Sequence, residues 1–337
     1  MHSTLLFTRK PRVLSAASLA GPAEGKGPLG GCFDGILEDD RLGEASFEKG
    51  EKRLLVETAR LCLRKAHMEE EQCGCFLCGD LLNQIISSSF AARELGMPYL
   101  GLYGACSTMT EGLLLGAVLT DGGYRDTALC AAVSHFSTAE RQYRFPLEMG
   151  TTTPPSAQRT VTGAGAVLLG REQRKDAPFS RIALTAATIG KVTDLGITDS
   201  SNMGAAMAPA AYDTVCAHLM NTRTVPEDFD AVCTGDLGRF GKQMLLELFE
   251  AAGTDVSKKL FDCGEEIYAP EQNYHCGGSG CGCSALVLAG YVLPRLERGS
   301  WRRVLFLSTG ALMSPLTCNQ GESIPGIAHV IELARED

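Results

Sequence analysis

The sequence predicts a layered α/β fold built from two similar halves. Short apolar runs, typical of buried strands, alternate along the chain with longer runs of helical periodicity. Several local motifs recur in the same order later in the chain, which indicates an internal duplication. The composition agrees, because 38 glycines and only 7% aromatic residues among 337 favour closely packed elements. We expect a largely parallel sheet covered by helices on both faces.

Strands and helices alternate in the first half. Apolar positions at helical spacing predict helices, and continuous apolar runs predict strands. The predicted helices are residues 48–67, 83–95 and 111–119, and the predicted strands are residues 75–78, 98–103 and 127–133.

The second half repeats this plan. The sequence Cys-Gly-Asp-Leu at 78–81 closes a strand, and Thr-Gly-Asp-Leu at 234–237 closes another one at 230–233. Cys106-Ser107 opens a buried helix, and Cys283-Ser284 opens a second one over residues 285–293. A further strand-like run begins at Ile182. We therefore predict an N-terminal half over residues 1–176 and a C-terminal half over residues 177–337.

Charge and hydropathy exclude several classes of protein. A net charge of -9 without clustered Lys or Arg argues against a nucleic-acid surface and against binding to an anionic membrane. No window approaches the roughly 20 apolar residues of a membrane span. The basic residues before the small-residue run at 16–20 resemble a signal peptide, but the run is weakly apolar and a Gly/Pro-rich stretch follows. We expect a soluble chain.

The 14 cysteines favour a reduced, intracellular protein, since disulfide scaffolds are short secreted chains. Two groups of cysteines lie close together in the sequence, as zinc ligands often do. One group is Cys73, Cys75 and Cys78, and the other is Cys276, Cys281 and Cys283. The first lies on a predicted strand, where neighbouring side chains point to opposite faces. We expect small core thiols, with a structural zinc as the alternative.

An ordered set of motifs resembles the stage V sporulation protein AD family, within the thiolase and ketosynthase superfamily. These motifs are residues 79–84, 101–108, 138–142, 160–163, 203–211 and 277–281. The resemblance implies a thiolase-like, duplicated five-layer αβαβα architecture and a homodimer made by joining two central sheets.

The superfamily resemblance also implies a nucleophile, Cys106, at the N-terminus of a buried helix, where the helix dipole favours a thiolate. It implies an oxyanion hole from the backbone N–H groups of Cys106 and Gly310. A basic pair, His with His or Asn, completes a condensing enzyme. Here Gly235 or Asp236 stands where the first His belongs, and residues 277–280 contain neither His nor Asn. We therefore do not expect condensation, and the carboxylate of Asp236 opposes thiolate formation.

The family resemblance implies binding of dipicolinate (pyridine-2,6-dicarboxylate) and its uptake into the developing spore with membrane-embedded partner proteins. Such a ligand needs an apolar slot for its ring and cations or N–H donors for its carboxylates. The candidate ligand-binding residues are Cys106, His135, Arg141, Arg159, Lys191, Asp236 and Gly310. We predict no cofactor, although calcium can accompany dipicolinate, and Asp194, Asp199 and Asn202 are either calcium ligands or a solvated loop.

Other interpretations remain open from the sequence. Cys106 could be the acyl-carrying nucleophile of an acyltransferase or condensing enzyme, assisted by His275. The chain could instead be a scaffolding subunit of a membrane channel. Residues 203–211, small and apolar, either line the pocket or form a close-packed contact. We expect a cytoplasmic or forespore protein held at the inner spore membrane through its partners.

Overall fold

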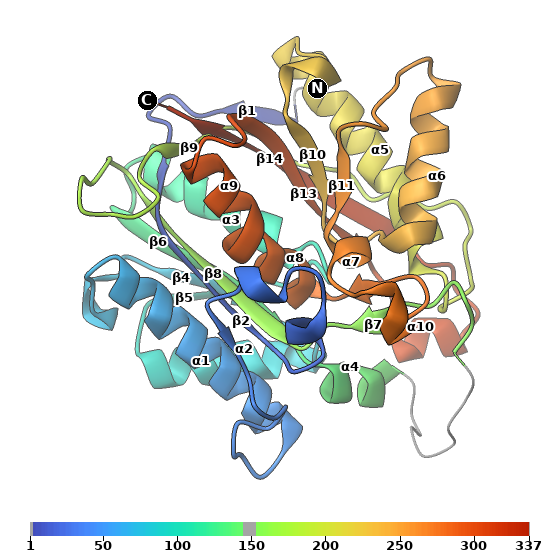
Figure 1. The fold of residues 1–337 in the computed structure, drawn as a ribbon, viewed down its shortest axis with the longest axis horizontal. Helices are drawn as coiled ribbons and strands as arrows, with labels where there is room; N and C mark the ends of the chain where they lie inside the picture. Colours follow the sequence, from blue (N-terminus) through green and yellow to red (C-terminus); the bar gives the residue numbers. More distant parts are fainter. Residues whose placement is uncertain (1–2, 144–152, 337) are drawn as a thin grey trace.

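The computed structural model describes residues 3–143 and 153–336. Its main sheet has 12 strands in the order β11-β10-β13-β14-β9-β2-β8-β6-β4-β5, with β1 paired to β9 and β3 to β2 (Figure 1). The strands are β1 (Thr4–Leu6), β2 (Arg12–Ala20), β3 (Gly35–Ile36), β4 (Phe76–Gly79), β5 (Tyr99–Gly101), β6 (Thr127–Ser134), β8 (Gly163–Gly170), β9 (Ile182–Thr188), β10 (Ala231–Thr234), β11 (Leu260–Asp262), β13 (Arg303–Ala311) and β14 (Gly326–Arg335). A separate two-stranded ribbon pairs β7 (Arg159–Thr160) with β12 (Gly278–Ser279).

The strand order contains the expected duplication. From one edge inward the first half runs β5-β4-β6-β8-β2, and from the other edge the second half runs β11-β10-β13-β14-β9. The five strands of one half therefore match the five strands of the other, both in their position in the sheet and in their order along the chain. The two half-sheets meet where β2 and β9 share the single residue pair Arg12↔Ala183.

The expectation of a largely parallel sheet was wrong. β8 runs antiparallel to both β6 and β2, and β14 runs antiparallel to both β13 and β9. Parallel pairs within the main sheet join β4 to β5 and β6 in one half and β10 to β11 and β13 in the other, and the short β3 runs parallel to β2. The connection from β6 to β8 starts and ends at one end of the sheet, and so does the connection from β13 to β14. Strands joined in this way are antiparallel.

The helices form the remaining layers (Figure 1). α1 and α2 cover the outer face of the first half, α5 and α6 cover that of the second, and α3 and α8 lie between the two half-sheets. The helices are α1 (Phe47–Lys65), α2 (Ile86–Leu95), α3 (Thr108–Asp121), α4 (Phe136–Tyr143), α5 (Met203–Thr222), α6 (Gly238–Ala251), α7 (Cys263–Glu266), α8 (Cys281–Val287), α9 (Leu293–Glu297) and α10 (Pro315–Asn319). A π-helical segment, Leu288–Val292, joins α8 to α9. None of the described helices is long and apolar enough to span a membrane.

The predicted helix at 83–95 begins later than expected. Gln84 and Ile85 have left-handed φ values of 60° and 47°, so a short 3₁₀ turn precedes α2 and the α-helix starts at Ile86. The predicted helix at 111–119 instead begins earlier, at Thr108, directly behind the cysteine turn.

Close approach of strands to the middle helices accounts for part of the glycine content. A Cβ atom on Gly165 of β8 would lie 2.1 Å from the carbonyl oxygen of Ala285 in α8. Real Cβ atoms do not come so close to a backbone atom, so only glycine permits this packing. The small-residue run at 16–20 belongs to the buried central strand β2, which explains its resemblance to a signal peptide.

All 14 cysteines are free thiols, and most of them are buried. Cys73 and Cys75 contribute to different core clusters. Among the described residues, no group of three His, Cys, Asp or Glu is arranged to hold a metal ion.

Candidate functional site

Cys106 lies on a sharp turn between β5 and α3. Ala105, before it, has a left-handed φ of 50°, which a residue with a side chain rarely adopts. The turn is fixed by two hydrogen bonds: the Ser107 hydroxyl donates to the Gly104 carbonyl at 2.7 Å, and the Gly104 N–H donates to the Thr108 hydroxyl at 3.2 Å. The strained turn thus presents the Cys106 thiol at the start of the buried helix.

Gly310 of β13 packs against the cysteine turn. A Cβ atom at this position would lie 2.4 Å from the Gly104 carbonyl oxygen and 3.3 Å from the Ser107 nitrogen. The structure therefore brings Gly310 beside Cys106 and requires a residue without a side chain there.

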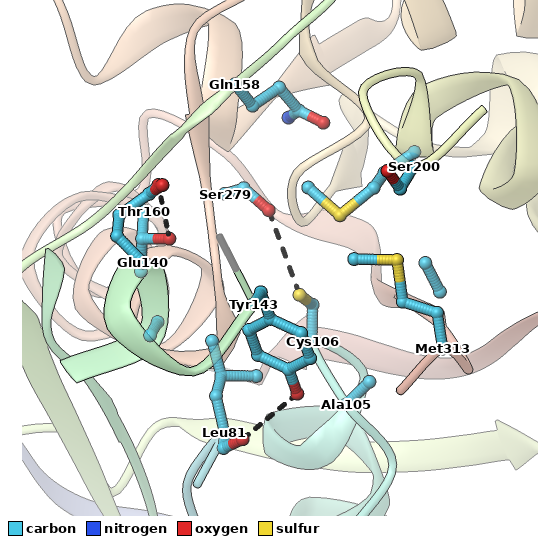
Figure 2. Close-up of a pocket in the computed structure, with 13 residues that line it drawn as sticks. Leu81, Ala105, Cys106, Glu140, Tyr143, Gln158, Thr160, Ser200, Ser279 and Met313 are labelled. Atoms are coloured by element: carbon cyan, nitrogen blue, oxygen red, sulfur yellow. Dashed lines mark hydrogen bonds between the residues drawn. The ribbon is translucent and has the colours of Figure 1, made fainter. Parts of the chain in front are cut away.

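The second half supplies a carboxylate to the thiol. Asp236, fully buried between β10 and α6, accepts hydrogen bonds from the Ser279 hydroxyl at 3.0 Å, the Gly280 N–H at 2.9 Å and the Thr309 hydroxyl at 3.0 Å. The Ser279 oxygen lies 3.9 Å from the Cys106 sulfur (Figure 2). The Asp236 carboxylate is close enough to the thiol to raise its pKa. Cys106, Asp236, Ser279 and Thr309 form one buried polar network, called here the Asp236 network.

The electrostatics of this network keep the thiol neutral. Burial raises the pKa of Asp236 to about 6, although hydrogen bonds to the carboxylate oppose the shift. Burial, and next the negative charge of Asp236, raise the pKa of the Cys106 thiol well above its usual value. The helix dipole was expected to favour a thiolate, but the buried carboxylate and desolvation outweigh it. At neutral pH the site contains a thiol and, opposite it, a carboxylate.

A cavity opens above the thiol (Figure 2). It is lined by Leu81, Ala105, Cys106, Ala139, Glu140, Tyr143, Gln158, Thr160, Ser200, Met203, Ser279, Ala311 and Met313. The Tyr143 hydroxyl donates to the Leu81 carbonyl at 3.1 Å, and the Thr160 hydroxyl donates to Glu140 at 3.4 Å. No described lining residue is Lys, Arg or His.

His135 does not line this cavity. It is fully buried at the end of β6, where its Nδ1 accepts the N–H of Ser137 at 3.1 Å and its Nε2 therefore donates to the Asp40 carbonyl at 2.8 Å. Its ring packs on Phe47, and burial lowers its pKa. The residue is a neutral packed histidine, because it is buried and both ring nitrogens are bonded to backbone groups.

The other candidate cations lie outside the cavity lining. Arg141 is half-exposed on α4 and pairs with Glu48 of α1. Lys191 is 71% exposed and pairs with Asp213 of α5 at 2.8 Å. Arg159 stacks its guanidinium on Phe136 and Tyr274, with 3.7 Å and 4.5 Å to the ring centroids. None of these three cations is a described lining residue of the cavity, and each contacts side chains elsewhere in the protein.

The calcium candidates serve local turns. Asp194 accepts from the Gly196 N–H and the Ser323 hydroxyl, Asp199 accepts from the Ser201 N–H, and Asn202 caps α5. Within residues 203–211, Met203 lines the cavity and residues 205–208 are buried. His275 is exposed, away from the thiol.

The sequence analysis missed Ser279, Thr309 and Gln158. Gln158 donates through its Nε2 to the Asp236 carbonyl at 2.8 Å and to the Gly278 carbonyl at 2.7 Å, so it ties together the two loops that carry the network. Ser279 carried a signal, since it lies in the glycine loop where a second catalytic partner was sought. A hydroxyl at this position differs from the His or Asn that the superfamily resemblance implies there.

The comparisons with known proteins agree with this architecture. A family model described as stage V sporulation protein AD matches residues 1–334. The stage V sporulation protein AD of Bacillus subtilis (strain 168) is 40% identical over 332 residues, which cover 98% of this chain and 96% of that protein.

Two solved structures show the fold alone. The 3-oxoacyl-[acyl-carrier-protein] synthase III of Aquifex aeolicus VF5 has a TM-score of 0.59 at 12% identity, and the match covers 96% of this chain and 99% of that one. The cerulenin-bound OleA of Xanthomonas campestris has a TM-score of 0.62 at 15% identity, with 99% of this chain and 98% of that one covered. The fold is thiolase-like, as expected.

Proposed function

Because this chain belongs to the stage V sporulation protein AD family, we propose that it binds dipicolinate, as the calcium chelate, in the cavity beside Cys106 and supports dipicolinate uptake into the developing spore. The observation that carries the proposal is the Asp236 network, which holds the thiol protonated. A protonated thiol is a poor nucleophile and a weak hydrogen-bond donor. The cavity is therefore suited to hold a ligand without forming a covalent bond to it.

The walls of the cavity suit a flat ring with polar edges. Leu81, Met203 and Met313 supply apolar surface, and Tyr143 adds an aromatic side chain. Hydroxyl and thiol groups gather at the base, where Ser279 and Cys106 lie side by side (Figure 2). Apolar walls with a few convergent polar groups are typical of small-molecule sites.

The charge of the cavity favours the calcium chelate over the free dianion. Asp236 lies behind the thiol, Glu140 contributes a second carboxyl group, and the described lining contains no basic side chain. Two ligand carboxylates would be repelled by these carboxyl groups, and among the described lining residues no Arg or Lys offsets the repulsion. Calcium as part of the cargo neutralises the ligand before it enters, so the protein needs no cation of its own.

The proposal also covers assembly and location. The chain acts as a homodimer with membrane proteins of the spore uptake channel, in the cytoplasm or forespore beside the inner spore membrane. The edge strand β5 supports the dimer, because among the described strands it has a neighbour on one side only, and Leu100 and Tyr103 beside this edge are about half-exposed.

Titration calorimetry tests the binding proposal. The folded protein is titrated at neutral pH with dipicolinate, with and without equimolar calcium, and we expect binding with calcium and much weaker binding without it. Isophthalate, which lacks the ring nitrogen, is the matched control because it chelates calcium poorly. Absence of binding by folded protein at millimolar chelate contradicts the proposal, and equal affinity for free dianion and chelate contradicts its calcium part.

A further inference from the structure

A second hollow region lies outside the cavity already described and shares no lining residue with it. Two adjoining depressions run along the start of α6 and the segment 268–277, and both are lined by Pro155, Arg239, Glu265 and His275. We call this elongated region the α6 groove. Its position on the surface leaves it open to a partner.

The α6 groove carries an excess of positive charge in an acidic protein. Arg239 and Lys242 are one turn apart on α6, and Glu265 lies between them, 3.8 Å from Arg239 and 2.6 Å from Lys242. One carboxylate thus serves two cations, and the imidazole of His275 is adjacent. Since the whole chain has a net charge of -9, this local excess is not a consequence of composition.

The backbone of the groove is held in a strained conformation. Asn273 and His275 have left-handed φ values of 56° and 45°. The segment is tied to the first turn of α6, because the Arg239 N–H donates to the Cys276 carbonyl at 2.8 Å and the Phe240 N–H donates to the Cys276 sulfur at 3.1 Å. These hydrogen bonds fix the segment against the first turn of α6.

Both depressions also have aromatic or apolar walls. Tyr268 and Tyr274 pack edge to face, with 4.7 Å between ring centroids, and line one depression. Phe240, which is 48% exposed, lines the other with Leu246. Each depression therefore combines apolar or aromatic side chains with charged ones.

We propose that the α6 groove binds an extended acidic peptide segment of a partner protein. Two adjoining depressions match a chain better than one compact ligand, and Arg239 and Lys242 pair with carboxylate side chains. The aromatic and proline walls accept the apolar residues between those carboxylates. This proposal does not depend on the dipicolinate proposal, since no residue is shared.

Fluorescence anisotropy with the full chain tests it. The probe is a short fluorescein-labelled peptide in which Asp alternates with Leu and Tyr, and the reference peptide has Asn in place of Asp. We expect the Asp peptide to bind, the Asn peptide to bind at least about tenfold more weakly, and added salt to reduce the difference. The double variant Arg239→Gln, Lys242→Gln should lose about tenfold in affinity while keeping the unfolding midpoint.

A matched control removes two positive charges elsewhere. Arg125 and Arg171 lie beside the start of β6 and the end of β8, so Arg125→Gln with Arg171→Gln should leave binding unchanged. Equal binding of the Asp and Asn peptides, or equal losses in the two double variants, overturns the proposal. Full displacement of the peptide by millimolar succinate also overturns it, because the groove is then a site for small carboxylates.

Discussion

Ser279 donates its hydroxyl hydrogen to Asp236 at 3.0 Å while its oxygen lies 3.9 Å from the sulfur of Cys106. This serine therefore links the Cys106 thiol to a buried carboxylate, and none of the described residues that line the cavity beside the thiol is a histidine.

Asp236→Asn should make Cys106 more reactive. The substitution removes the negative charge that raises the thiol pKa, while the amide retains an oxygen for Ser279 and Gly280. Alkylation at pH 8 should become about tenfold faster for each unit by which the pKa falls. Iodoacetamide labelling read by peptide mass spectrometry measures it, with exposed Cys32 as the internal reference. An unchanged Cys106 rate would mean that burial alone sets its pKa.

The Asp236 carboxyl should make stability depend on pH. Its pKa rises from 3.8 to about 6 on folding, so between these values the folded state holds the proton more tightly than the unfolded state. The free energy of unfolding therefore falls as pH rises through this window, by up to about 3 kcal/mol for about two pKa units.

Asp236→Asn isolates this contribution from that of other buried carboxylates. The stability of the variant relative to the wild type should increase by up to about 3 kcal/mol between pH 4 and pH 7. Urea denaturation at both pH values measures it. A constant difference between the two proteins would place the folded-state pKa near its ordinary value.

Gly310→Ala should destabilise the cysteine turn. The new methyl would lie 2.4 Å from the Gly104 carbonyl, and overpacking of this kind costs about 1–3 kcal/mol. Gly31→Ala is the matched control, because a Cβ there has no neighbour within 4 Å. Thermal unfolding of the two variants should separate them by several degrees, and equal midpoints would show that the turn can move away from β13.

Incubation with acyl-CoA should leave Cys106 unmodified. The thiol is neutral, and the described residues that line the cavity include no histidine, so they supply neither a thiolate nor an imidazole base to start acyl transfer. Intact-protein mass spectrometry with acetyl-CoA and malonyl-CoA measures the outcome. A stable adduct mapped to Cys106, with release of CoA, would favour the acyltransferase alternative.

The sequence predicts the layers and the cysteine turn well, because both depend on local patterns. The turn at Cys106 and the strand-closing motif that holds Asp236 follow from motifs read in order, and the superfamily resemblance implies a place for Gly310 beside Cys106. The antiparallel orientation of β8 relative to β6, and of β14 relative to β13, was not predicted, since a continuous apolar run does not reveal the direction of a strand.

The cations were predicted less well because closeness in sequence was taken for closeness in space. His135 ends the correct strand, yet its ring turns to the Asp40 carbonyl. Arg141 follows on the next helix and reaches Glu48 on a neighbouring one.

Thr309 precedes Gly310 on the same strand, but its hydroxyl matters only because β13 brings it beside Asp236, a contact between segments 73 positions apart.

The pairing of β1 with β9 has a consequence for how the chain divides. The first strand, Thr4–Leu6, lies against the sheet of the second half, and the Thr4 hydroxyl contacts Thr188 at 2.8 Å. A cut at the boundary near residue 176 would therefore separate β9, in the C-terminal fragment, from β1, in the N-terminal fragment. The N-terminal fragment would keep that strand without its partner, so the two halves are interlocked and neither fragment retains all the pairings of its own strands.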